Sequence, residues 1–264
     1  MTTLLETDSL SIRFGGVQAA TDVSVKVGEW EIVGIIGPNG AGKTTTFNMI
    51  TGFYKPNTGR VRYRGQDVTD LPVHKRTALG MGRTFQNVGL VKGATVRENL
   101  VTAQHLRAEY GAVSAMLGSP DAFETERALR LEADEILDVL GLGELAETRV
   151  AGLPYGQLKR VEVATVLATD PDLLLLDEPT SGMGPEEAHA FGDTLIELRR
   201  DFGLTILMIE HHVPLVVSVC DYVYCLNFGQ ILAEGLPNDV RNHPEVVRAY
   251  LGEDPDEIAQ MEAG

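Results

Sequence analysis

The stretch from residue 37 to residue 45 reads Gly37-Pro38-Asn39-Gly40-Ala41-Gly42-Lys43-Thr44-Thr45. Its first eight residues fulfil the pattern GxxxxGK[ST] of a phosphate-binding loop. The apolar run Glu31–Ile36 before it predicts a strand, and Thr44–Ile50 after it predicts a helix. Glycines let successive backbone N–H groups curl around phosphate oxygens, and the helix N-terminus adds positive charge. We therefore expect this loop to bind ATP, with Lys43 at the β- and γ-phosphates and the Thr44 hydroxyl on Mg²⁺.

Two further apolar runs lie later in the chain, at Leu173–Leu176 and Leu204–Ile209. Both are short and continuous, which is typical of parallel strands covered by helices on both faces. Glu186–Arg200 between them predicts a crossover helix. In an open parallel sheet, ligands bind at the carboxyl ends of the strands. The residues that directly follow these runs should therefore lie beside the phosphate loop.

Acidic and histidine side chains follow the two runs. Asp177 and Glu178 come after the first, and His211 and His212 come shortly after the second. Asp177 suits the surroundings of Mg²⁺, Glu178 is placed to polarise the water that attacks the γ-phosphate, and His211 is a candidate contact to that phosphate. The alternatives are a strand that simply ends in surface acids and a surface histidine pair. For His212 the surface interpretation is preferred.

The remaining patterns predict the rest of the fold. Residues 4–36 alternate apolar and polar positions around glycines, which predicts short antiparallel strands, and residues 95–168 are mainly helical in pattern. Tyr222–Leu226 and Gln230–Glu234 predict a hairpin, and residues 243–252 a short helix. The sequence thus predicts an α/β fold with a mostly parallel sheet, an N-terminal antiparallel β part and an inserted helical subdomain.

Composition limits the classes of partner. Against 22 basic residues stand 38 acidic ones, and the formal net charge of −16 opposes binding to nucleic acid or anionic lipid. No apolar run reaches the ~18 residues of a spanning helix, and the N-terminus lacks the features of a signal peptide, so we expect any membrane role to come through a partner. Cys220 and Cys225 lack the spacing of a zinc or redox site and are expected to be core thiols in the reducing cytosol.

Taken together, these residues resemble the ABC ATPase family along essentially the whole chain. Five features occur in the family's order and at its usual spacings: the phosphate loop, Gln86, Leu153-Pro154-Tyr155-Gly156-Gln157, Asp177-Glu178 and His211. The closer likeness is to the ATPases of branched-chain amino-acid importers. It is carried by IGPNGAGKTTTFNMITGFYKPNTG (36–59), GRTFQNVGL (82–90), PYGQLKRVEVATVLATDPDLLLLDEP (154–179) and RAYLG (248–252).

The resemblance implies an organisation of the chain and roles for further residues. It implies one ABC ATPase domain, with residues 1–87 and 170–264 as the nucleotide-binding core and residues 88–169 as the helical subdomain. Phe14 would stack on adenine, a core phenylalanine being the alternative. Gln86 would sense Mg²⁺ or the attacking water and link the ATP site to the membrane partner. From the sequence alone, an ordinary loop glutamine is the better interpretation of Gln86.

A second group of implied residues acts between subunits. Tyr155, Gly156 and Gln157 would begin a helix whose N-terminus points at the ATP bound by a second ABC ATPase. That second subunit is either identical or different, and two ATP molecules would be sandwiched between the pair. The other implied partners are transmembrane permease subunits and, indirectly, an extracytoplasmic solute-binding protein. The chain would then lie peripherally at the cytoplasmic face of the cell membrane.

The function that this resemblance implies is an ATPase that powers import of branched-chain or other hydrophobic amino acids. The first alternative is the ATPase of a system that exports lipopolysaccharide or another lipid. A non-transport ABC protein is the second, but it would need long coiled-coil insertions, two cassettes or a basic patch, and the sequence contains none of these. We therefore expect no nucleic-acid partner.

Three departures from the family pattern qualify these roles. Pro154 and Tyr155 replace the serine and first glycine of Leu-Ser-Gly-Gly-Gln, which removes a hydroxyl and a backbone N–H that could reach phosphate. Gly184 and His212 each stand where many relatives have aspartate. We expect weaker contacts across the dimer, and we hypothesise that the chain is one member of an unequal pair of ATPases.

Overall fold

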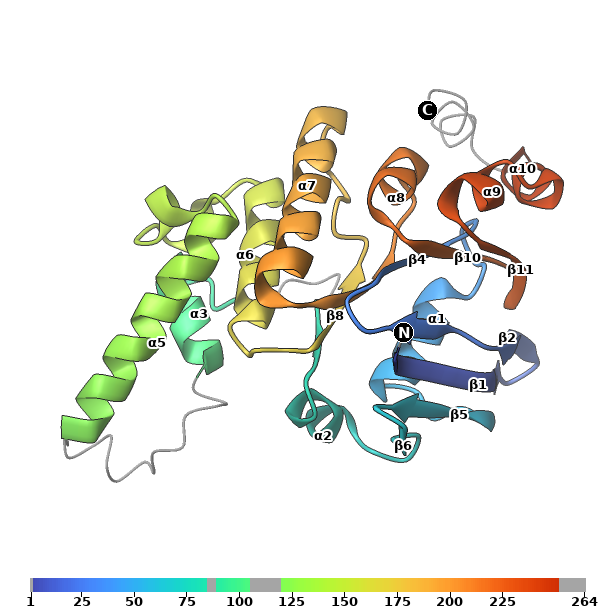
Figure 1. Cartoon of the computed structure of the whole chain (residues 1–264), viewed down its shortest axis with the longest axis horizontal. Helices are drawn as coiled ribbons and strands as arrows, with labels where there is room; N and C mark the ends of the chain where they lie inside the picture. Colours follow the sequence, from blue (N-terminus) through green and yellow to red (C-terminus); the bar gives the residue numbers. More distant parts are fainter. Residues whose placement is uncertain (1, 85–88, 105–119, 252–264) are drawn as a thin grey trace. The chain divides into compact units, whose positions relative to one another are not determined.

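The structure is a computed structural model of the 264-residue chain, and it describes residues 2–84, 89–104 and 120–251 (Figure 1). The chain divides into two compact units. The core unit comprises Met1–Arg83 and Asp172–Gly264, and the helical unit comprises Thr84–Pro171. Gln86 lies outside the described residues.

A six-stranded sheet forms the centre of the core unit, in the strand order β11-β10-β4-β9-β8-β7. Every residue of β4, β8 and β9 is buried, as the continuous apolar runs predict, and neighbouring strands from β7 to β10 pair in parallel. Parallel pairing aligns the carboxyl ends of these strands at one edge of the sheet. The bounds are β4 (Ile32–Ile36), β7 (Met81–Arg83), β8 (Leu173–Asp177), β9 (Thr205–Ile209), β10 (Tyr222–Asn227) and β11 (Gln230–Gly235).

A second, antiparallel sheet has the order β2-β1-β5-β6, and β3 also pairs with β1. The N-terminal strands are those that the alternating pattern predicts. Two further strands, which lie beyond the phosphate loop in sequence, complete the sheet and were not predicted. The bounds are β1 (Thr3–Phe14), β2 (Val17–Val23), β3 (Lys26–Gly28), β5 (Thr58–Tyr63) and β6 (Gln66–Asp67).

Helix α1 (Lys43–Thr51) fills the space between the two sheets (Figure 1). Its side chains Phe47, Met49 and Ile50 are fully buried in one apolar cluster with residues of both sheets. On the other side of the six-stranded sheet lie α7 (Pro185–Phe202) and α8 (Val213–Val219). The core therefore fixes the start of α1, and with it the phosphate loop, relative to the strand ends.

Helix α7 shows how local sequence sets an element's limits. Proline occupies its first turn together with Glu186 and Glu187, and basic residues occupy its last turn, which complements the helix dipole. The helix ends because Gly203 adopts the left-handed conformation at φ 62°. The core unit also contains α2 (Val73–Ala78), α9 (Pro237–Arg241) and the expected C-terminal helix α10 (Pro244–Leu251).

The helical unit contains α3 (Val96–Gln104), α5 (Pro120–Val139) and α6 (Tyr155–Leu167), with short 3₁₀ turns at Gly143–Leu145 and Val150–Gly152. Apolar side chains at helical spacing build its own core: Val96, Leu100, Ala133, Ile136, Leu137, Leu140, Val161 and Ala164 are buried. The helical insertion expected from the sequence is confirmed.

Two observations concern the whole described chain. Cys220 and Cys225 are both buried, and neither forms a disulfide. Burial raises the pKa of the Cys225 thiol to about 12. Within residues 2–84, 89–104 and 120–251, none of the helices combines the length and the apolar character that crossing a membrane requires.

Candidate nucleotide site

A cavity of about 390 Å³ lies beside the phosphate loop in the core unit. The loop connects the end of β4 to the start of α1, so the first N–H groups of a buried helix face the cavity. Residues from four other segments complete its wall. The lining residues are Val17, Gln18, Ala19, Asn39, Gly40, Ala41, Gly42, Lys43, Thr44, Thr45, Glu178, His211, Phe228 and Gly229.

Glycine is required at both ends of the loop. Gly37 has φ +142°, and a Cβ there would collide with the carbonyl oxygen of Leu226. Gly42 has φ +96°, and a Cβ there would lie 2.7 Å from the carbonyl oxygen of Ala19. Any other residue would have to displace backbone at either position. The sequence motif therefore reflects close backbone approach as well as phosphate chemistry.

Lys43 is buried at the start of α1, and its amino group lies over the loop. Its Nζ atom donates hydrogen bonds to the carbonyl oxygens of Gly37 and of Pro38, the second at 2.9 Å. A lysine amino group can donate three hydrogen bonds, and a phosphate oxygen is a stronger acceptor than a carbonyl. The side chain is thus poised within the loop to exchange carbonyl partners for phosphate oxygens.

Glu178 and His211 form a pair at one end of the cavity. The Oε1 atom of Glu178 lies 2.9 Å from the Nε2 atom of His211, and both side chains remain partly accessible. Glu178 has φ 49°, and its N–H donates to the carbonyl oxygen of Ile209 at the end of β9. The parallel pairing of β8 with β9 therefore brings together two side chains that are 33 positions apart in the sequence.

Asp177 forms a buried ion pair that the sequence did not suggest. The Nη2 atom of Arg83 donates to the Oδ2 atom of Asp177 at 2.9 Å, with side-chain exposures of 8% and 2%. The Nη1 atom of Arg83 also donates to Asn48 and Thr51 of α1, at 2.7 and 2.8 Å. Arg83 thus ties the end of β8 to the helix that carries Lys43. Asp177 is not among the residues that line the cavity.

Glu210 is a second residue that sequence reasoning missed. Its carboxylate is 3% exposed and accepts four hydrogen bonds. Oε1 accepts from the N–H and the hydroxyl of Thr180, at 2.9 and 2.7 Å, and Oε2 accepts from the N–H groups of His211 and His212, at 3.0 and 3.3 Å. It therefore joins the turn after Glu178 to the turn that carries His211. The sequence signal that could have identified Glu210 is an acidic residue directly after an apolar strand.

The oxygen donors present fit a magnesium ion. Mg²⁺ is bound by hard oxygen ligands, and in nucleotide sites it takes one or two from the protein and the rest from phosphates and water. Thr44 lines the cavity and carries a hydroxyl group, and Asp177 supplies a carboxylate at the end of β8, which is separated from β4 by β9. Among the described residues, no three His, Cys, Asp or Glu side chains gather to hold a metal by themselves. A metal here would accordingly depend on phosphate oxygens.

Aromatic residues near the cavity differ from the expectation. Phe14 is 45% exposed, which excludes the alternative of a core phenylalanine, and its ring packs edge-on against Tyr54 with centroids 5.1 Å apart. Phe14 does not line the cavity, whereas Phe228, which is 87% exposed, does. The turn between β10 and β11 thus brings an aromatic ring to the site that no motif marked.

The four residues that depart from the family pattern, Pro154, Tyr155, Gly184 and His212, each lie at the start of a helix. Tyr155, Gly156 and Gln157 form the first turn of α6 in the helical unit, with Pro154 at the N-cap. Gly184 caps α7 at φ −72°, a value open to any residue. His212 caps α8 and is partly exposed, which is compatible with the preferred interpretation as a surface histidine. His212 lines a second cavity, of about 320 Å³, together with Glu178, Glu210 and His211.

A phosphate loop between a parallel strand and a buried helix, with acidic and histidine side chains at neighbouring strand ends, defines a nucleoside triphosphatase of the phosphate-loop class. The chain belongs to the ABC transporter family of ATP-binding proteins. A family model described as "ABC transporter" matches residues 20–181, and one described as "Branched-chain amino acid ATP-binding cassette transporter" matches residues 230–260. The chain is accordingly an ATPase that binds nucleotide.

Individual relatives agree with this assignment. The chain is 43% identical to the high-affinity branched-chain amino acid transport ATP-binding protein LivG of Salmonella typhimurium, over 95% of this chain and 98% of LivG. It is 33% identical to the lipopolysaccharide export system ATP-binding protein LptB of Haemophilus influenzae, over 95% of this chain and 98% of LptB. The ADP conformation of the ATP-binding cassette MJ1267 superposes with a TM-score of 0.82, at 32% identity, covering 96% of this chain and all of that chain.

Proposed function

We propose that this chain is the ATP-binding and hydrolysing subunit of an importer of branched-chain or other hydrophobic amino acids. The observation that carries the enzymatic part is the pairing of Glu178 with His211, 2.9 Å apart, in the same cavity as the phosphate loop. The cargo assignment rests on the name of LivG, which is more similar to this chain than LptB, and on the match of residues 230–260.

In the proposed reaction, the loop N–H groups and Lys43 bind the β- and γ-phosphates of ATP. Glu178 accepts a hydrogen bond from a water molecule and orients its oxygen toward the γ-phosphorus. A new P–O bond forms as the bond to the β–γ bridging oxygen breaks, which yields ADP and inorganic phosphate. His211, hydrogen-bonded to Glu178, holds that carboxylate in place and presents its ring to the γ-phosphate.

The magnesium site and the partners belong to the same proposal. Thr44 and Asp177 would hold Mg²⁺, which, when bound, neutralises charge on the phosphate oxygens. The proposal includes the roles that the resemblance implies for three further sites. Phe14 stacks on adenine, Gln86 links the ATP site to the membrane partner, and residues 155–157 face the ATP bound by a second subunit. We propose that the chain pairs with a second ABC ATPase on permease subunits at the cytoplasmic face of the membrane, and that a solute-binding protein delivers the cargo.

The test of the enzymatic part compares the wild type with Glu178→Gln. The amide keeps the shape of the side chain but cannot act as a base, so ATP binding should persist while turnover falls by about 10²-fold or more. Hydrolysis is followed as Mg²⁺-dependent phosphate release, and dimer formation as molecular mass with ATP present. Glu197→Gln, on the exposed face of α7, is the matched control. Hydrolysis at the wild-type rate by Glu178→Gln would remove Glu178 from its role.

The cargo needs a separate test with the whole transporter. The complex of this chain with its permease subunits is reconstituted in lipid vesicles with the binding protein, and ATP hydrolysis is measured against candidate solutes. Leucine, isoleucine or valine should raise the rate, and lipopolysaccharide should not. Stimulation by the lipid alone would replace the importer by an exporter while leaving the ATPase assignment intact.

A further inference from the structure

The C-terminal helix α10 reaches the first residue of the phosphate loop. Its inward face carries Val246 and Tyr250, which lie four positions apart and are 0% and 1% exposed. The hydroxyl oxygen of Tyr250 accepts a hydrogen bond from the backbone N–H of Gly37 at 2.8 Å. The two residues are 213 positions apart in the sequence, and Tyr250 lies in the segment matched by the branched-chain amino-acid transporter model.

Gly37 is the point where strand β4 becomes the loop. Its N–H points to Tyr250, and its carbonyl oxygen accepts a hydrogen bond from the amino group of Lys43. A buried N–H that loses its acceptor is costly, so this peptide group would rotate or shift in search of another one. Such a movement of the Ile36–Gly37 peptide group changes the backbone dihedral angles at Gly37 and so shifts the next peptide group, whose carbonyl oxygen positions Lys43. The Tyr250 hydroxyl therefore acts on the phosphate-binding lysine through one residue, Gly37, whose N–H and carbonyl belong to two successive peptide groups.

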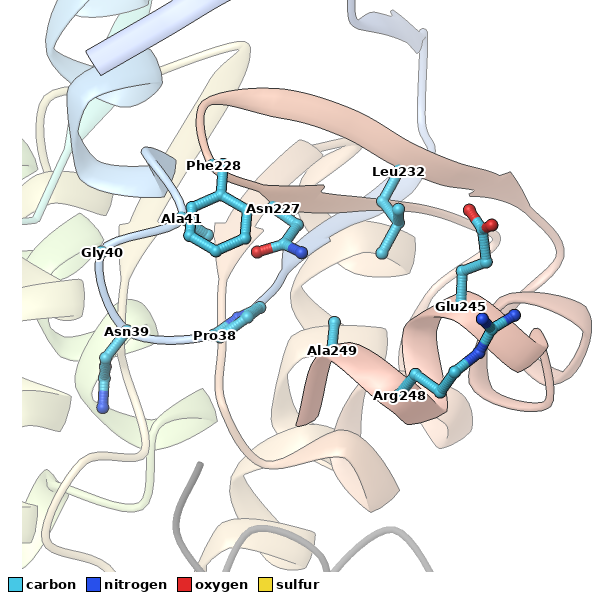
Figure 2. Close-up of a pocket in the computed structure, with 10 residues that line it drawn as sticks. All are labelled: Pro38, Asn39, Gly40, Ala41, Asn227, Phe228, Leu232, Glu245, Arg248 and Ala249. Carbon is cyan, nitrogen blue, oxygen red and sulfur yellow. The ribbon is translucent and has the colours of Figure 1, made fainter. Parts of the chain in front are cut away.

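The space between α10 and the rest of the loop is hollow. A cavity of about 480 Å³ is lined by Pro38–Ala41 of the loop, by Asn227 and Phe228 of the β10–β11 turn, and by Arg248 and Ala249 of α10 (Figure 2). A closely packed contact would hold the loop through many side chains. Two of the hydrogen bonds that anchor the loop are the one from the Gly37 N–H to Tyr250 and the one from the Gly229 N–H to the Ala41 carbonyl oxygen, at 2.9 Å. The first of these two anchors comes from α10.

We propose that Tyr250 is a positioning residue of the nucleotide site, and that the docking of α10 is coupled to phosphate binding. The proposal rests on the nucleotide-binding role of the loop given above. A loop held in its binding conformation loses less freedom when phosphate binds, so the hydroxyl raises the affinity for ATP without touching it. Because such coupling is reciprocal, bound ATP should in turn hold α10 more firmly against the core unit.

The direct test is Tyr250→Phe, which keeps the buried ring and removes only the hydroxyl. Equilibrium titration with a fluorescent ATP analogue should give a dissociation constant about fivefold or more above that of the wild type. The turnover number at saturating ATP should stay within about twofold, because Glu178 and His211 are untouched. A purely structural role would lower stability and leave the dissociation constant of the folded protein unchanged.

Because the coupling is reciprocal, the effect of ATP on helix α10 provides a second measurement. Backbone hydrogen exchange in Pro244–Leu251 should slow when ATP is added to the wild type, and it should slow by less in Tyr250→Phe. Exchange at the Gly37 amide should be faster in the variant with and without nucleotide. Equal protection of α10 by ATP in both proteins would contradict the coupling.

Val246→Ala is the matched control, because Val246 is buried on the same face of α10 but makes no hydrogen bond to the loop among the described residues. This variant should unfold at a lower urea concentration and bind ATP as the wild type does. An equal loss of ATP affinity in Val246→Ala would assign the effect to helix docking in general and overturn the role of the hydroxyl. Unchanged affinity in Tyr250→Phe would refute the inference alone, whereas a wild type that binds no ATP would refute the proposed function as well.

Discussion

At the scale of single residues, Lys43 tests the assignment of the loop most directly. Its buried amino group donates hydrogen bonds to carbonyl oxygens of the loop. Removing this group should therefore take away the positive charge that would face the phosphates, with a smaller effect on packing. Lys43→Ala should weaken ATP binding by about 1.5–3 kcal/mol, the range for a hydrogen bond to a charged group. Titration calorimetry with ATP measures this change.

The control for this prediction is Lys55→Ala, which removes an exposed lysine paired with Asp70 outside the cavity. Surface ion pairs contribute little, so ATP affinity should not change in this variant. If Lys43→Ala bound ATP as tightly as Lys55→Ala does, residues 37–44 would not be the phosphate site.

The Arg83–Asp177 pair makes a prediction about stability. Arg83→Met keeps most of the side-chain volume but leaves the Asp177 carboxylate, 2% exposed, without its guanidinium partner. A buried charge that loses its partner costs about 3–5 kcal/mol of unfolding free energy. Urea unfolding should show a loss of that size, and adding Asp177→Asn to Arg83→Met should recover part of it. A double variant that is as unstable as the sum of the two single ones would show that the pair is not coupled.

At the scale of elements, Glu210 joins the segments that follow β8 and β9. All four of its hydrogen-bond partners are donors. Glu210→Gln would turn an amide NH₂ toward two of them, so the substitution is not conservative here. We expect it to lower the unfolding free energy by about 1–3 kcal/mol and to reduce turnover by releasing His211 from Glu178, with ATP affinity nearly unchanged.

Two measurements decide that prediction. Urea unfolding gives the stability, and steady-state kinetics separate the turnover number from the Michaelis constant. Glu210→Ala should lower stability at least as much as Glu210→Gln, because it leaves all four donors without an acceptor, whereas the amide oxygen of glutamine still accepts from two of them. Wild-type turnover in Glu210→Gln would mean that the two segments keep their geometry without this carboxylate.

The elements that were predictable from sequence are those with strong local signals. The continuous apolar runs of β8 and β9, the phosphate-loop motif before α1 and the terminal helix α10 are all found where the sequence places them. Strands β5 to β7 and helix α2 were missed because they have two to six residues and little periodicity. Short strands acquire their structure from pairing with distant strands.

The same reason explains which parts of the site were missed. Glu178 and His211 follow apolar strands, so strand order alone brings them together. Arg83, Glu210 and Tyr250 instead act through contacts with residues 94, 30 and 213 positions away. Side-chain partners at such separations depend on the assembled core, and no motif or local period encodes them.

At the scale of the whole molecule, buried acids of high pKa make stability depend on alkaline pH. Burial raises the pKa of the Cys225 thiol from its ordinary 9.0 to about 12, and the pKa values of Tyr63 and Tyr224 from 10.0 to about 12. In the unfolded chain, these groups lose their protons at the ordinary values. Above pH 9 the unfolded state therefore binds fewer protons than the folded state, and stability falls as the pH rises.

Cys225 isolates one contribution to this fall, because it is fully buried and its thiol begins to ionise in the unfolded chain before either tyrosine does. The contribution of Cys225 to the free energy of unfolding is fully present below pH 9, and it decreases above that pH by up to about 1.4 kcal/mol per pH unit. Urea unfolding of the wild type and of Cys225→Ala between pH 8 and about 10.5 should give a shallower decline in the variant, whatever its stability at pH 8. Parallel declines would show that the folded protein ionises this thiol as readily as the unfolded chain does, and that burial does not raise its pKa.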